Sequence, residues 1–180
     1  MIIIFLVLFI CIILSFLIIN YINYYNKIQS FIIRINEAES SIDTILRKRF
    51  DLLNKSINVI KNITKEENIL EQIVKLRSRK LSNFDLDRKL YECINEFNNF
   101  KSNYKELLKD ESFMKIDIGL NESEAEVVAL RKYYNDLITD YNKVIKKAPS
   151  NVVAYINKFK VKPYFDGKNM EDDITNDFKL

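Results

Sequence analysis

Histidine is absent from this 180-residue sequence, and glycine and proline each occur only twice. Without histidine the chain cannot form a Ser-His or Cys-His nucleophile pair, or the Glu-x-x-His motif of di-iron helical bundles. The two glycines, Gly119 and Gly167, are far apart, which excludes a glycine-rich phosphate-binding loop. We therefore expect no enzymatic activity, no cofactor, no metal site and no small-molecule substrate.

The scarcity of helix breakers also indicates the fold class. A chain with 48% hydrophobic residues, 29% charged residues and so little glycine and proline is expected to be all-helical with short connections. The two cysteines do not suggest a disulfide framework, because Cys11 lies in an apolar run and Cys93 lies far along the chain. A net charge of +3 is too small to argue for a nucleic-acid partner.

The sequence does contain one long hydrophobic run, Ile2–Ile19, which includes no charged residue. As a helix this run spans about 27 Å, close to the thickness of a bilayer's hydrocarbon core. It lacks the charged start and the small-residue cleavage site of a signal peptide. We therefore predict an uncleaved single-pass transmembrane helix in contact with the lipid bilayer. Tyr21, Tyr24 and Tyr25 follow where an aromatic belt would meet the headgroups.

Basic residues follow this run but do not precede it, and the nearest are Lys27 and Arg34. The only positive charge on the other side is the terminal amine. The positive-inside rule then predicts a cell-membrane protein whose N-terminus lies outside and whose soluble domain is cytoplasmic.

Beyond the run, apolar residues recur at mostly three- and four-residue steps, and no glycine or proline interrupts them. This spacing is typical of one apolar stripe on a helix that is otherwise exposed to water. We therefore predict one continuous helix over Ile2–Asn62, whose stripe the rest of the chain must cover. The stripe consists of Tyr25, Ile28, Ile32, Ile35, Ile42, Leu46, Phe50, Leu53, Ile57 and Ile60.

Two further helices are predicted in the middle of the chain. Thr64 and Glu67 have the spacing of a capping box, which predicts a second helix over Lys65–Leu81. A third helix, capped by Asn83 or Asp85, follows. The inward residues are expected to be Ile69, Ile73 and Leu76, and then Leu86, Leu90, Cys93, Phe97, Phe100, Tyr104 and Leu107. At its place in this stripe Cys93 is interpreted as a small buried apolar residue.

The fourth predicted helix has the most regular pattern. Its stripe is Phe113, Ile116, Leu120, Ser123, Val127, Leu130, Tyr134, Leu137, Tyr141, Val144 and Ala148. Pro149 is expected to end it, and Ser150 to cap a fifth helix over Asn151–Lys160. That short helix is expected to turn Val152, Ile156 and Phe159 inward, and the residues Lys162–Phe165 to be extended.

The helix lengths allow two arrangements. Helices two and three could form one broken rod beside helix one, or turn back at Ser82-Asn83 to give an up-down-up-down four-helix bundle. We predict an all-α antiparallel helical bundle with four main helices, the first continuous with the transmembrane helix. The expected domains are a transmembrane helix (1–20), a helical-bundle domain (21–165) and a disordered acidic tail (166–180).

Several stretches of the sequence together resemble signatures of the LemA family. Ile42-Asp43 and Leu46–Leu53 resemble its first-helix element, "ID..L.RRYDLI". The later element, "RR.YN...DYN......PSN", and the family's ending are resembled by Arg131–Asp136, Asp140–Asn142, Pro149–Asn151 and Lys162–Phe165.

Two positions depart from the family pattern. Asn54 stands where the family usually has a proline, and Tyr104-Lys105 stands where it usually has Tyr-Pro. The resemblance implies a bacterial helical-bundle domain on an N-terminal membrane helix, with no established enzymatic activity.

Candidate contact residues lie within the resembling stretches. Asp43, Arg47 and Asp51 form an acid-base-acid ladder at four-residue steps. Such a ladder is either a surface array of salt bridges or a contact for a partner. Arg131 is a further candidate for a partner contact. Two other charged clusters are interpreted as solvated surface: the acidic Glu122, Glu124 and Glu126, and the basic turn Arg77–Lys80.

The pair Tyr134-Asn135 recurs one heptad later as Tyr141-Asn142. Because both tyrosines lie in the stripe of the fourth helix, we expect their rings to be largely buried against the first helix, with the hydroxyls reaching polar groups. The asparagines lie at the flank, where an amide can bond across to a neighbouring helix. If the tyrosines instead faced solvent, the repeat would be a partner-binding surface.

These features favour a membrane-anchored coiled-coil bundle that scaffolds or recruits other proteins at the cytoplasmic face of a bacterial membrane. The alternative is a self-assembly module that forms membrane-bound homo-oligomers.

Overall fold

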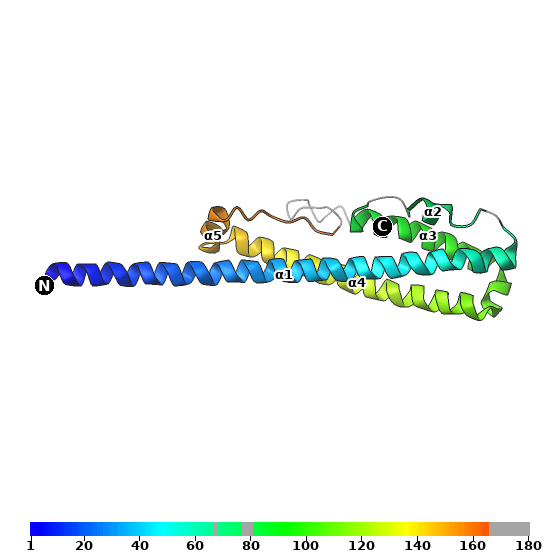
Figure 1. Cartoon of the computed structure of the whole chain (residues 1–180), viewed down its shortest axis with the longest axis horizontal. Coiled ribbons are helices and arrows are strands. Elements are labelled where there is room, and N and C mark those ends of the chain that lie inside the picture. The colour runs from blue at the N-terminus through cyan, green and yellow to red at the C-terminus, as the bar shows by residue number, and fades with distance from the viewer. Residues whose placement is uncertain (67, 77–80, 166–180) are drawn as a thin grey trace, which may run out of the picture. The chain divides into compact units, whose positions relative to one another are not determined.

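The computed structural model describes residues 1–66, 68–76 and 81–165, and these residues form helices without any strand (Figure 1). In chain order the helices are α1 (Ile2–Thr64), α2 (Glu71–Leu76), α3 (Asn83–Asn103), the 3-10 helix η1 (Lys105–Lys109), α4 (Glu111–Lys146) and α5 (Ser150–Ile156). The predicted all-α class is therefore confirmed. The predicted acidic tail and the basic turn over residues 77–80 lie outside the described residues.

The chain divides into two compact units. The first unit combines Met1–Glu37 with Tyr134–Leu180, and the second unit is Ala38–Tyr133. Both α1 and α4 contribute residues to each unit. This partition does not test the predicted domain boundaries, which stay a prediction.

The predicted continuous first helix is confirmed, because α1 is uninterrupted over 63 residues. Its first part is long and apolar enough to cross a membrane, and the residues that the structure describes bury none of it. The stripe that follows is buried at six of its ten predicted positions, and the other four, Tyr25, Ile32, Phe50 and Ile57, are half-buried. The six buried residues are Ile28, Ile35, Ile42, Leu46, Leu53 and Ile60.

Lys65 ends α1 by adopting a positive φ of 64°, a conformation usually left to glycine. The predicted capping box is wrong, because Thr64 is the last residue of α1 and does not begin a new helix. Its hydroxyl donates to the carbonyl oxygen of Ile60 at 2.9 Å and accepts from the N–H of Glu66 at 3.3 Å.

α2 begins at Glu71, six residues later than predicted, and residues 77–80 near its predicted end lie outside the described residues. Leu70 has a φ of 48° and is not helical, and its N–H donates to the carboxylate of Glu96 on α3 at 2.9 Å. A helix running through Leu70 would lose this contact, so α2 begins only at Glu71. The inward residues of this segment were predicted correctly, because Ile69, Ile73 and Leu76 are buried.

The second unit has the up-down-up-down arrangement, and the broken rod is excluded. Asn83, at the start of α3, donates to the carbonyl oxygen of Glu39 at 3.4 Å, and Tyr104, just after α3, donates to Glu66 at 2.8 Å. α3 therefore runs parallel to this part of α1, and the segment containing α2, which joins the end of α1 to the start of α3, runs in the opposite direction (Figure 1). α4 then returns beside α3, with the rings of Phe97 and Phe113 stacked at 4.8 Å.

Two of the predicted helix caps are wrong. Ser82 caps α3, where Asn83 or Asp85 was expected, because its hydroxyl accepts from the N–H of Asp85 at 3.1 Å. Ser150 does not cap α5, because its hydroxyl donates to two carbonyl oxygens at the end of α4. These bonds hold the chain where it leaves α4.

The inner face of α5 is one residue out of register with the prediction. Val153 and Ala154 are buried, whereas Val152 and Ile156 are exposed. The helix ends at Ile156, shortly before Lys158 takes a positive φ of 56°. A helix of fewer than two turns offers too few residues for periodicity to assign its phase.

Cys93 on α3 is buried, as predicted, and desolvation with Glu96 and Glu92 nearby raises the pKa of its thiol to about 11. Only the thiolate reacts readily with alkylating agents. At about pH 8, close to the ordinary thiol pKa, we expect iodoacetamide to modify Cys93 slowly in the folded protein and rapidly in urea, as measured by mass spectrometry. Equal rates in both conditions would contradict the burial of this thiol.

Candidate functional site

The repeated tyrosine-asparagine pairs hold the segment Lys160–Phe165 against α4 in the first unit. Tyr141 is 2% exposed, and its hydroxyl donates to the carbonyl oxygen of Lys160 at 2.9 Å. The amide of Asn142 donates to the carbonyl oxygen of Lys162 at 2.8 Å and accepts from the N–H of Lys162 at 2.9 Å. Asn135 accepts from the N–H of Phe165 at 2.8 Å. We call these three side chains with their segment the clamp.

Helix geometry explains why the pairs recur at a heptad. Asn142 bonds to Lys162 and Asn135 to Phe165, so seven residues of α4 match three residues of the segment, in opposite directions. Seven helical residues rise about 10.5 Å, and three extended residues span about 10 Å. One asparagine per heptad of α4 can therefore bond to every third residue of the extended segment.

The predicted burial is confirmed for Tyr141, whereas Tyr134 is less completely buried than Tyr141. Tyr134 is half-buried, with its ring edge-on to Phe165 at 6.2 Å. The asparagines were expected to reach a neighbouring helix. They bond instead to the backbone of the segment 160–165, whose N–H and carbonyl groups can bond to side chains because the segment is not helical.

Asn142→Ala is expected to destabilise the folded protein by about 2 kcal/mol. The Asn142 side chain is only 1% exposed, and its removal leaves the N–H and the carbonyl group of Lys162 without their hydrogen-bond partner. Hydrogen exchange over residues 160–165 should accelerate at the same time. Asn135→Ala is the matched control. It removes a single hydrogen bond, which the half-buried Asn135 amide accepts from Phe165, so its loss of stability should be smaller. Unchanged exchange in Asn142→Ala would show that other contacts hold the segment.

The second unit contains a cluster of charges between three helices. Arg49 of α1 is 0% exposed and contacts Asp87 of α3 at 3.4 Å. Arg131 of α4 contacts the other carboxylate oxygen of Asp87 at 2.5 Å, and Glu124 of α4 pairs with Arg49. We call these four residues the charge cluster. Its two positive and two negative charges compensate each other where burial has removed most of their water.

Sequence reasoning identified Arg131 but missed Arg49 and Asp87. It assigned Glu124 to a solvated face, where its side chain is indeed 44% exposed, but it missed the pairing of Glu124 with Arg49. A signal for Arg49 was present: it lies three residues after Leu46 and four before Leu53, both of which are buried. A charged residue at such a stripe position needs a buried partner. The predicted stripe instead contains its neighbour Phe50, which is only half-buried.

The predicted ladder on α1 is only a pair. Arg47 contacts Asp43 at 2.7 Å, and this hydrogen bond and charge raise the pKa of the Arg47 guanidinium. Asp51 is exposed and makes no ion pair with the residues that the structure describes. It lies instead at a shallow groove of about 370 Å³, which we call the charged groove. Its lining is Thr44, Arg47, Lys48, Asp51, Leu52 and Lys55.

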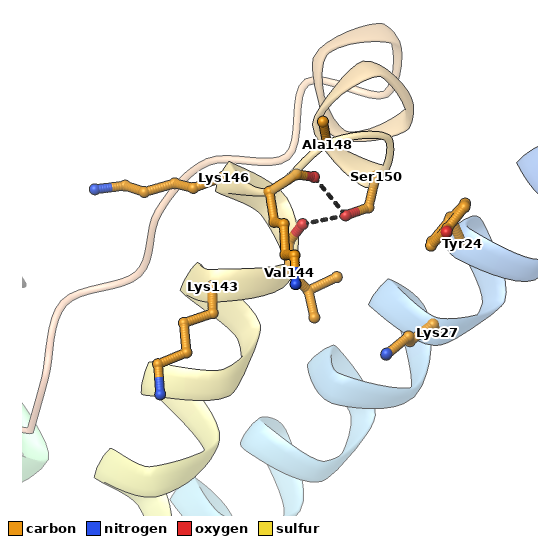
Figure 2. Close-up of a pocket in the computed structure, with 8 residues that line it drawn as sticks. Tyr24, Lys27, Lys143, Val144, Lys146, Ala148 and Ser150 are labelled. Atoms are coloured by element: carbon orange, nitrogen blue, oxygen red, sulfur yellow. Dashed lines mark hydrogen bonds between the residues drawn. The ribbon is translucent and has the colours of Figure 1, made fainter.

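A basic pocket of about 660 Å³ lies in the first unit (Figure 2). Its lining comes from α1, from the end of α4 and from the turn after it: Tyr24, Lys27, Lys143, Val144, Lys146, Lys147, Ala148 and Ser150. The hydroxyl of Ser150 donates to the carbonyl oxygens of Val144 and Lys147 at 2.5 and 2.8 Å, which holds the turn at its rim. Sequence reasoning missed this pocket because its lysines come from separate helices.

None of these sites has the chemistry of a metal centre. Within the described parts of the chain, no group of three or more Cys, Asp or Glu side chains is arranged to hold a metal ion. The clamp bonds to the protein's own backbone, and the charge cluster is internally paired. The charged groove and the basic pocket are two surfaces of the described residues that other molecules can reach.

Comparison with known proteins agrees with the motifs. A model of the LemA family matches residues 38–178, which include the charge cluster, the clamp and most of α1 beyond its apolar part. No curated protein matches the chain significantly. Because the match covers more than half of the chain, this protein belongs to the LemA family.

Proposed function

We propose that this protein is a non-enzymatic, membrane-anchored helical bundle that recruits or scaffolds other proteins at the cytoplasmic face of a bacterial cell membrane. The continuity of α1 supports this most directly. One helix carries an unburied apolar span and then, without a break, the buried stripe of a folded bundle. Such a helix would hold the bundle at a fixed distance from the bilayer.

The charged groove is the surface that we propose for partner contact. Arg47, Lys48, Asp51 and Lys55 are exposed there, and the groove is open to solvent on α1. Exposed charges of both signs add little to stability but can select a partner of complementary charge.

A photo-crosslinking amino acid at Asp51 tests this proposal in native membranes. We expect it to capture a different protein as one discrete product, which the substitutions Arg47→Glu and Lys48→Glu abolish. Absence of any product at Asp51 would count against recruitment through this groove.

Self-assembly is the alternative, and exposed Ile118 and Val128 on α4 favour it, because apolar side chains on a helix surface suit a helix-helix contact. The same crosslinker at Val128 would then capture a second copy of this chain. A defined oligomer in mild detergent would support this reading, and a monomer would support recruitment.

The proposed orientation rests on Lys27 and Arg34, which follow the apolar span. Protease added outside intact cells should leave the bundle whole, and protease added to permeabilised cells should digest it. Digestion in intact cells would reverse the proposed topology.

A further inference from the structure

The outer face of α5 is apolar although it is exposed. Val152 and Ile156 are each 58% exposed and Tyr155 is 86% exposed, while the inner residues Val153 and Ala154 are buried. Three neighbouring exposed apolar side chains on so short a helix form a patch that water solvates poorly. Such a patch is typical of a surface that something else covers.

Contacts within the first unit place α5 beside the end of the apolar span. Asn157, directly after α5, donates to the hydroxyl of Tyr21 at 2.9 Å, and the ring of Phe159 lies 6.1 Å from that of Tyr25. Tyr21 is two residues beyond Ile19, a helical rise of about 3 Å. α5 therefore lies at the level where α1 would leave the hydrocarbon of a bilayer.

The charged residues near α5 in the sequence are of one sign. Residues 141–165 contain six lysines and no Asp or Glu, and three of these lysines line the basic pocket. Lys158 and Lys160 follow α5 and are exposed. A basic rim around exposed apolar side chains is the pattern of segments that bind anionic membrane surfaces.

We propose that α5 contacts the same bilayer that α1 spans, with Val152, Tyr155 and Ile156 entering the interfacial region and the surrounding lysines binding the phosphates of anionic lipids. A bilayer fits this surface better than a protein partner for two reasons. The apolar patch is level with the end of the apolar span, and its charge complements anionic headgroups. The inference rests on the membrane anchor of the proposed function.

The chain contains no tryptophan, so one introduced tryptophan reports its own surroundings. The full-length Tyr155→Trp variant is reconstituted in phosphatidylglycerol vesicles with or without brominated acyl chains. The matched control is Tyr91→Trp, since Tyr91 is an exposed tyrosine of α3 in the second unit. We expect bromine to quench Tyr155→Trp emission by roughly half or more and to leave Tyr91→Trp unchanged.

If bromine quenched the emission of the two variants equally, the inference would be overturned. A blue-shifted but unquenched Tyr155→Trp would also overturn it, because the patch would then be covered by protein. Flotation separates these results from failure of the anchor: a protein that does not float with the vesicles refutes both proposals, whereas one that floats without quenching refutes only this one. In phosphatidylcholine the quenching should be weaker, and equal quenching would overturn the role of the lysines.

Discussion

Asp87→Ala is expected to destabilise the folded protein by about 3–5 kcal/mol, one of the two largest effects that we predict. Asp87 is the carboxylate shared by Arg49 and Arg131. Without it, the fully buried guanidinium of Arg49 retains only Glu124, whose side chain is 44% exposed, and the positive charge of Arg131 lies nearby. Urea unfolding in mild detergent, followed by circular dichroism, measures the loss.

Asp51→Ala is the matched control, because it removes an exposed carboxylate that pairs with no described residue. It should leave the urea midpoint almost unchanged. A similar midpoint for Asp87→Ala would mean that water solvates Arg49 and that the charge cluster is not buried in solution.

The size of this effect would not measure a net stabilisation by the cluster. Desolvating four charged groups offsets much of their mutual attraction, so replacing all of them together with apolar residues could cost little. What the cluster does require is one axial register of α1 against α3 and α4. Arg49 meets Asp87 and Glu124 only in that register, and a shift of the helix would leave a buried charge unpaired.

Tyr141→Ala is expected to cost about 3–5 kcal/mol, as a large-to-small change at a buried ring. Tyr141→Phe keeps the ring and should cost only about 1–2 kcal/mol, the share of the bond to Lys160. Tyr134→Ala should cost less than Tyr141→Ala, because Tyr134 is half-buried. Equal effects of the two alanine variants would contradict this difference in burial.

Titration gives a second test of the same ring. Burial raises the pKa of the Tyr141 hydroxyl above its ordinary value of 10.0. As the pH rises past that value, the unfolded chain loses this proton while the folded protein keeps it, so the stability due to this group falls. The stability difference between the native sequence and Tyr141→Phe should therefore shrink above about pH 10.

The sequence by itself determined the long helices, the apolar span and the family. Periodicity is a local property, and it assigned α1 and α4 because each repeats its pattern over many turns. No glycine or proline interrupts α1, and the single glycine of α4, Gly119, does not break the helix. The same regularity placed Tyr141 correctly in the core. The motifs around Asp43 and Asn135 identified the family before any contact was known.

Only the tertiary structure decided what lies against each face. Arg49 and Asp87 are 38 residues apart in the chain, and Asn157 and Tyr21 are 136 apart, so no local pattern could join them. The start of α2 and the phase of α5 were also settled by such contacts, because short helices draw their stability from packing and not from their own periodicity. A stripe records which residues share a face, whereas the partner of that face depends on how distant segments pack together.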